Sequence, residues 1–160
     1  MKVACIGHIP QELSIWSDYR PVILPYLVSI CDDLLYKLNA TEVISGFAYG
    51  FETAIGLSAL GLGIRLKSAI PYKGLGTNWP AEDRKLLGKL TSLSEVRYES
   101  SNQYSTYAVH KKNIWMIDYC DHLLVLWDGR QGEIKDSLDY AVKINKPFTN
   151  VWEIYANRHA

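Results

Sequence analysis

Short apolar runs alternate with longer segments of helical periodicity along most of the chain. The apolar runs predict strands at Lys2–Ile6, Val43–Ser45, Leu66–Ile70, Glu95–Tyr98 and His122–Trp127, with a last short strand after Lys146. The periodic segments predict helices at Pro21–Leu38, Thr53–Leu62, Ala81–Leu90, Tyr104–Tyr119 and Glu133–Ile144, followed by a C-terminal tail at 151–160. This alternation predicts an α/β fold of the Rossmann-like, doubly wound kind, with a mostly parallel sheet and helices on both faces.

Chain length and charge narrow the classes of protein further. At 160 residues, the chain is expected to form a single domain, 1–160, around one core. The 17 basic side chains balance the 17 acidic ones, so binding of nucleic acid through a broad basic surface is not expected. No apolar stretch reaches the roughly 20 residues that cross a bilayer, and the N-terminus does not resemble a signal peptide. We therefore expect a cytoplasmic protein that does not bind membranes.

The cysteines and the potential ligands of metals suggest neither a disulfide framework nor a metal site. Cys5, Cys31 and Cys120 are odd in number, far apart and surrounded by apolar residues, which predicts buried thiols. No group of His, Cys or acidic residues has the spacing of metal ligands. We expect no metal and no cofactor.

A glycine-bearing turn joins the second predicted strand to the following helix. The turn has the sequence Ser45-Gly46-Phe47-Ala48-Tyr49-Gly50, and a helical pattern starts just after it. Glycines leave backbone N–H groups accessible, and such groups at a helix N-terminus favour an anion, most often phosphate. An ordinary connection whose glycines only permit close packing would have the same pattern.

Other candidate residues follow strands that end at the same edge of the predicted sheet, where open α/β sheets bind ligands. His8 follows the first strand, Trp79 belongs to the long loop 71–80 after the third, and Gly129 to Gly132 follow the fifth. His8 either contacts a ligand or is simply solvated. Trp79, with Tyr72, either stacks on a base or ribose ring or holds the loop against the core. We place the predicted site at this shared edge.

These segments, in this order, resemble the SLOG superfamily of Rossmann-like proteins. The superfamily groups the DNA-processing protein A fold, the cytokinin-activating phosphoribohydrolases, and small bacterial and phage proteins of the YpsA and YoqJ kind, which this chain resembles most. The resemblance covers nearly the whole chain, to about Phe148. It rests on 7–10 (GHIP), 45–52 (SGFAYGFE), 70–72 (IPY), 78–80 (NWP), 112–118 (KNIWMID) and Asp121.

The resemblance implies a site for a nucleotide or a nucleotide-derived ligand. The residues that would contact the ligand or its phosphate are His8, Ser45, Gly46, Phe47, Ala48, Gly50, Trp79, Lys112, Asn113, Gly129, Arg130 and Gly132. Glu52 would approach the sugar or base; it is equally explained as a favourable acidic charge in the first helical turn. Relatives often pair through helices, so we also expect a dimer or higher homo-oligomer.

The enzymes of the superfamily carry a second motif, P-G-G-x-G-T-x-x-E, whose final glutamate helps to cleave an N-glycosidic bond. The matching stretch is 128–136 (DGRQGEIKD), in which Gly129 and Gly132 are kept and Arg130 replaces a glycine. Arg130 would grip phosphate with its two-pronged guanidinium group. Asp136 stands at the place of the glutamate and is one methylene shorter, so the match to the catalytic motif is incomplete. If the protein is an enzyme, we expect Glu52 and Asp136 to be its catalytic residues.

Three functions follow from these observations. The first is binding or sensing of a nucleotide-like small molecule without turnover. The second is hydrolysis of the N-glycosidic bond of a nucleoside 5′-monophosphate. The third is binding of single-stranded DNA, which the fold favours and the neutral charge disfavours, since a cluster such as Lys111, Lys112 and Lys135 releases few counterions.

Overall fold

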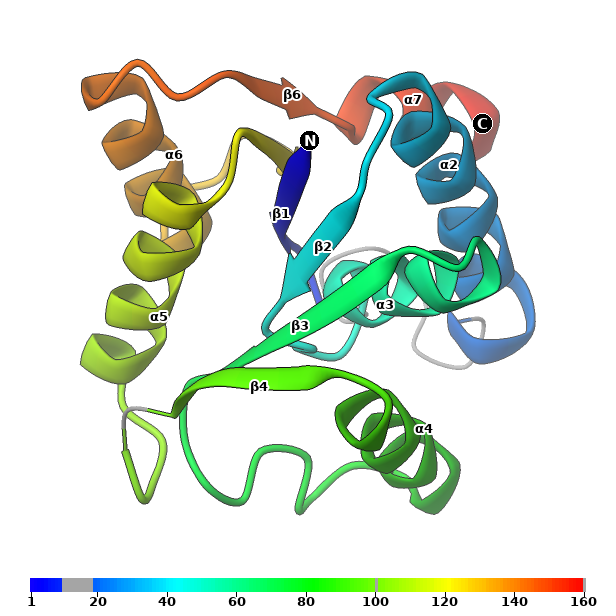
Figure 1. The fold of residues 1–160 in the computed structure, drawn as a ribbon, viewed down its shortest axis with the longest axis vertical. Coiled ribbons are helices and arrows are strands. Elements are labelled where there is room, and N and C mark those ends of the chain that lie inside the picture. Colours follow the sequence, from blue (N-terminus) through cyan, green and yellow to red (C-terminus); the bar gives the residue numbers. More distant parts are fainter. Residues whose placement is uncertain (10–18, 100, 160) are drawn as a thin grey trace.

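A computed structural model of the chain, which describes residues 1–9, 19–99 and 101–159, contains a parallel sheet (Figure 1). The described residues form six strands: β1 (Lys2–Gly7), β2 (Glu42–Ser45), β3 (Arg65–Ile70), β4 (Glu95–Glu99), β5 (His122–Leu126) and β6 (Phe148–Asn150). Their order across the sheet is β4-β3-β2-β1-β5-β6, and every pair is parallel. This confirms the predicted fold class.

Helices cover both faces of the sheet. The helices are α2 (Leu24–Lys37), α3 (Phe51–Gly61), α4 (Ala81–Ser92), α5 (Thr106–Tyr119), α6 (Glu133–Lys143) and α7 (Trp152–His159). In Figure 1, α5 and α6 lie on one side of the strands, and α2, α3 and α7 lie on the other. The pleat of β1 shows why: Val3 and Cys5 join the core under α2 and α3, whereas Ala4 and Ile6 join the core under α5 and α6.

The predicted start of the first long helix differs from the structure. A turn of π-helix at Tyr19–Ile23 precedes α2, so the helix does not begin regularly at Pro21. Pro25 stands in the first turn of α2 and has no N–H to donate, which suits a change of hydrogen-bonding pattern there. Pro10, in the first loop motif, lies outside the described residues.

The predicted C-terminal tail contains a helix, α7, that is docked on the core. Tyr155 is buried, and the hydroxyl of Tyr26 in α2 donates a hydrogen bond to its carbonyl oxygen (2.9 Å). The two rings also meet edge to face, with centroids 5.6 Å apart. These tertiary contacts, rather than any strong helical periodicity, stabilise the segment.

The order of the strands fixes where a site can form. The chain goes from β1 outward to β2, β3 and β4, and then returns to the other side of β1 as β5. The loops after β1, β2, β3 and β5 therefore meet at the carboxyl edge, around the point where the direction of winding reverses. None of the described helices is long and apolar enough to span a membrane.

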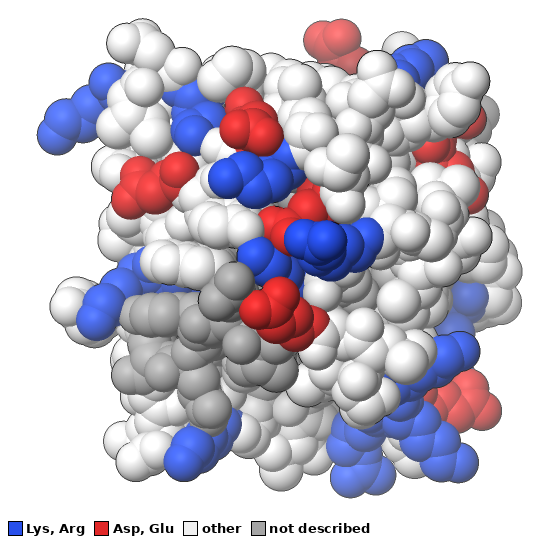
Figure 2. Space-filling model, viewed as in Figure 1, with Lys and Arg blue, Asp and Glu red and all other residues white. Residues whose placement is uncertain are grey.

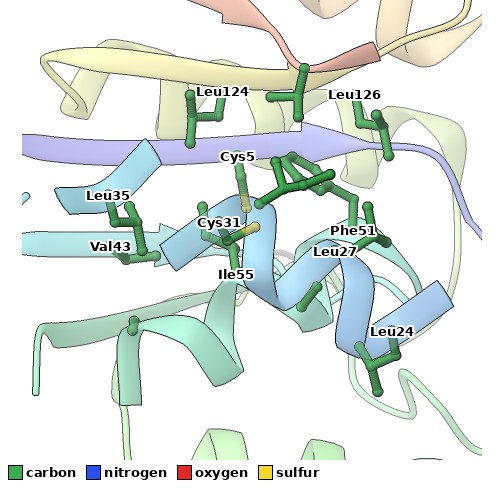
Figure 3. Packing of buried hydrophobic residues seen from close by; sticks show 14 of the residues in the cluster. Cys5, Leu24, Leu27, Cys31, Leu35, Val43, Phe51, Ile55, Leu124 and Leu126 are labelled. Atoms are coloured by element: carbon green, nitrogen blue, oxygen red, sulfur yellow. The ribbon is translucent and has the colours of Figure 1, made fainter. Parts of the chain in front are cut away.

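All three cysteine side chains are buried and form no disulfide, as predicted. Figure 3 shows two of them, Cys5 and Cys31, among the apolar side chains of one core cluster. Burial raises the pKa of each thiol, that of Cys120 to about 11. Because the thiolate is the reactive species, we expect a native sample to react negligibly with a thiol reagent such as Ellman's reagent within an hour at pH 8. The same sample in denaturant should release three equivalents. Rapid reaction of one thiol in the native protein would contradict this burial.

Candidate functional site

A cavity of about 680 Å³ lies at the carboxyl edge of the sheet. Its walls come from the loops after β1, β2, β3 and β5, from the first turns of α3 and α6, and from the first two turns of α5. The volume is in the range of sites that enclose a small organic molecule or a cofactor. Both glycine-bearing turns thus contribute to one hollow.

A buried ion pair lies in the wall of this cavity. Lys112 of α5 donates a hydrogen bond to Glu52 Oε1 of α3, with a Nζ to Oε1 distance of 3.4 Å, and the two side chains are 3% and 5% exposed. Both residues also line the cavity. A Cβ atom added to Gly46 would come within 2.5 Å of Lys112 Nζ and 2.9 Å of Glu52 Oε1. A larger residue at this position would displace the ion pair, which occupies the space beside the Gly46 backbone.

The start of α3 is closed by the loop after β1. The N–H of Phe51 donates a hydrogen bond to the carbonyl oxygen of His8 (3.3 Å), and a Cβ atom on Gly50 would lie 2.4 Å from that oxygen. The Ser45 hydroxyl donates to the Glu52 carbonyl and accepts from the Phe47 N–H, and Phe47 is fully buried. The second glycine of this turn therefore serves close backbone packing.

The start of α6 is open by contrast. Gly132 lines the cavity, and Cβ atoms added to Gly129 or Gly132 would meet nothing within 4 Å. Between them, Arg130 donates hydrogen bonds from Nε and Nη2 to the Asp128 carboxylate, which lowers the pKa of Asp128 to about 2. The first N–H groups of a helix have no partner within the helix, so this end can receive an anion.

A second polar contact joins α5 to α6 at the cavity. Asn113 is 2% exposed, and its amide nitrogen donates a hydrogen bond to the Ser137 hydroxyl (3.1 Å). Its amide oxygen has no hydrogen-bond partner among the described residues, although Asn113 lines the cavity. Such an oxygen is a potential acceptor for a donor that ligand binding brings close.

Aromatic side chains form another part of the wall. Tyr49 and Trp79 stack with ring centroids 5.1 Å apart and an interplanar angle of 29°, and Tyr72 meets Tyr104 edge to face at 5.6 Å. All four line the cavity. Trp79 thus both contacts the protein and borders the hollow, and its stacking on a base or ribose ring stays a prediction.

His8 is fully buried and lies outside the cavity lining. Its Nε2 accepts a hydrogen bond from the Asp128 N–H (2.9 Å), and its ring meets Trp152 of α7 edge to face. The imidazole therefore holds the loops after β1 and β5 together. His8 is not simply solvated.

The structure brings most of the predicted residues to one place. Gly46, Ala48, Glu52, Trp79, Lys112, Asn113, Arg130 and Gly132 line the cavity, whereas His8, Ser45, Phe47, Gly50, Gly129 and Asp136 are not in its lining. The side chain of Asp136 is exposed on α6. Its predicted catalytic role stays a prediction.

Sequence reasoning did not single out Glu133 or Tyr104, which line the same cavity. Glu133 follows Gly132 directly, so its position at the start of the predicted helix could have identified it as a site residue. Tyr104 comes from the loop before α5, and only the fold brings it to Tyr72. Among the described residues, no group of three or more His, Cys, Asp or Glu side chains is arranged to hold a metal ion.

Comparisons with known proteins agree with this architecture. The model of the YpsA family, described as the YspA SLOG family, matches residues 3–154. The uncharacterized SPbeta prophage-derived protein YoqJ of Bacillus subtilis is 22% identical over 134 residues, which cover 73% of this chain and 78% of YoqJ.

Two solved structures share the fold. DNA processing protein A from Streptococcus pneumoniae superposes with a TM-score of 0.63 at 17% sequence identity. DNA processing protein A from Helicobacter pylori, whose structure is described as giving insight into its single-stranded DNA binding mode, superposes with a TM-score of 0.64 at 19% sequence identity. Each similarity covers 92% of this chain, but the chain spans only 48% and 63% of those proteins. At such identities the similarity demonstrates the fold alone.

Proposed function

The chain belongs to the YpsA SLOG family, and from this premise we propose that its cavity binds a nucleotide or a nucleotide-derived phosphorylated small molecule. The observation that carries the proposal is that one hollow combines an open helix start, a buried ion pair and an aromatic wall. A phosphate can bind at the helix start, a sugar can form hydrogen bonds with the ion pair, and a base can stack on the aromatic wall.

The phosphate belongs at the start of α6 in this proposal. Gly132 has φ 141° and leaves space above the first N–H groups of the helix. Arg130 also lines the cavity and carries a guanidinium group that can turn from Asp128 toward a phosphate oxygen. The start of α3 is the poorer site because the His8 carbonyl oxygen already accepts from its first N–H.

The base and the sugar would occupy the rest of the hollow. A planar base can lie against Trp79 and Tyr72, because aromatic faces stack on any base. The Glu52 carboxylate is a good acceptor for ribose hydroxyls, since Lys112 balances its charge in a buried place.

Isothermal titration against a panel of nucleoside 5′-monophosphates, nucleosides and ADP-ribose tests this proposal. We expect at least one phosphorylated member to bind with one site per chain. Flat titrations for every member at high protein concentration would refute the proposal. A cytosolic location and a homo-oligomeric state belong to the same proposal, and light scattering with and without ligand tests the latter.

Single-stranded DNA is a competing ligand because the Helicobacter pylori relative is described as binding it. The charge of this chain weighs against it: the net formal charge is zero, and acidic and basic side chains are interspersed across the middle of the face shown in Figure 2. A salt-dependent gel shift with oligonucleotides, together with flat nucleotide titrations, would favour DNA instead.

Hydrolysis of a nucleoside 5′-monophosphate is the second candidate, favoured by two carboxylates, Glu52 and Glu133, in the lining of one cavity. In this reaction water adds to C1′ of the ribose and the base leaves with a proton. Release of free base by the natural chain would support this reaction if Glu52→Gln abolishes it. Asp139→Asn, which changes an exposed carboxylate of α6, should retain it. Binding without release would leave only the first candidate.

The aromatic wall gives a prediction for affinity. Trp79→Ala removes one stacking face, and base stacking contributes about 1–3 kcal/mol, so we expect the affinity for the bound nucleotide to fall at least about fivefold. Tyr36→Ala, which removes an exposed aromatic ring of α2 away from the cavity, is the matched control and should leave affinity unchanged. Titration calorimetry measures both; equal affinities in the two variants would place the base elsewhere.

A further inference from the structure

Glu133 occupies an unusual position for a site that receives phosphate. It is the first residue of α6, so its own N–H belongs to the group of amides that face an anion at this helix start. Glu133 lines the same cavity as Gly132 and Arg130, so its carboxylate belongs to the same site. A phosphate at this turn therefore meets favourable amides and an unfavourable carboxylate together.

The cations near Glu133 already have acidic partners. Lys112 of α5 pairs with Glu52 of α3, and Arg130 binds Asp128. The four charged residues in the lining, Glu52, Glu133, Lys112 and Arg130, sum to zero, so the cavity has no surplus of positive charge for a dianion. At separations of a few ångströms in a partly buried site, two like charges repel each other more strongly than they do in water.

The surroundings of Glu133 already favour its neutral form. Burial raises the pKa of this carboxyl, and Asp136 of α6 and Glu52 of α3 act in the same direction. Lys112 and His110 of α5 oppose them by favouring the charged form. A negative ligand at the start of α6 adds a further charge of the sign that favours protonation.

We propose that Glu133 decides which charge state of a phosphorylated ligand the site prefers, because a dianionic phosphate at α6 is repelled by the ionised Glu133 carboxylate and favours uptake of a proton onto it. Monoanionic phosphates and ligands without phosphate do not need this proton. The inference rests on the proposed function of the same cavity and adds to it a requirement on ligand charge. A phosphomonoester should therefore bind more weakly at a pH where Glu133 stays ionised in the complex.

Calorimetric titration with adenosine, guanosine, cytidine and uridine 5′-monophosphates at pH 5.5 and pH 8.0 tests the proposal. The second pKa of a phosphomonoester is about 6, and this titration of the ligand is the same for every variant. Glu133→Gln should bind the phosphates about tenfold more tightly than the natural chain at pH 8.0, as expected for one pKa unit of coupling. At pH 5.5, the two should differ less than threefold.

Two controls and a second readout separate the possible outcomes. Asp139→Asn removes an exposed carboxylate of the same helix and should bind like the natural chain. Titration in two buffers of different ionisation enthalpy should show proton uptake that Glu133→Gln reduces, and the corresponding nucleosides should bind both proteins equally. Phosphates that bind the natural chain and Glu133→Gln with equal affinity and proton uptake would overturn the inference alone. No binding by any phosphate would overturn the proposed function with it.

Discussion

Gly50→Ala is expected to lower the free energy of unfolding by roughly 3–5 kcal/mol, the sum of backbone strain and a steric clash. Gly50 has φ 124°, a conformation that side chains rarely adopt. The added Cβ atom would also lie 2.4 Å from the His8 carbonyl oxygen, which belongs to the backbone and cannot rotate away. Relief of that clash would break the contact between the start of α3 and the loop after β1, where the Phe51 N–H donates to the same oxygen.

Gly129→Ala separates the backbone strain from the steric clash in the expected loss of stability. Gly129 has φ 104°, but its added Cβ atom meets nothing within 4 Å, so only the strain of roughly 1–3 kcal/mol applies. Chemical denaturation with urea measures both variants. Equal losses for Gly50→Ala and Gly129→Ala would mean that the loop after β1 yields easily, and that the start of α3 can open toward the cavity after all.

The fold was predictable because its signals are local. The strands of a parallel sheet are buried on both faces and appear as uninterrupted apolar runs, of which 123–126 is the clearest. Helix α7 lacked such a sign: it is short, and its stability depends on Tyr155 reaching Tyr26 across the fold. A pattern within one segment cannot report a contact made by two distant segments.

The site was predictable at the level of its loops and less so at the level of atoms. Topology alone brings the turns after β2 and β5 to one edge, and both line the cavity. Which turn stays open depends on the His8 backbone packing on Gly50, a contact between segments far apart in the chain. The partner of Lys112 lies 60 residues away, so the sequence alone could not show that Glu52 belongs to a buried ion pair.

Removing Lys112 alone should destabilise the protein by about 3–5 kcal/mol, because it leaves the Glu52 carboxylate buried without its counter-ion. Both side chains are almost completely buried, and the distance between their charged atoms is 3.4 Å. We expect Lys112→Met and Glu52→Gln each to show a loss of this size in urea denaturation. The double variant Glu52→Gln with Lys112→Met should recover to within about 1 kcal/mol of the natural chain, since replacing both members of a buried pair is often nearly neutral.

The double variant also separates the structural role of the ion pair from its proposed role in binding. It should fold well and yet bind the nucleotide at least about tenfold more weakly, because the amide that Glu52→Gln introduces accepts hydrogen bonds from ribose hydroxyls less strongly than a carboxylate does. Calorimetric titration of the double variant, compared with Ser92→Ala at the exposed end of α4 as a surface control, measures this difference. If the double variant folds and binds like the natural chain, the pair only holds α5 against α3, and the ligand's hydroxyl groups are recognised by another part of the cavity.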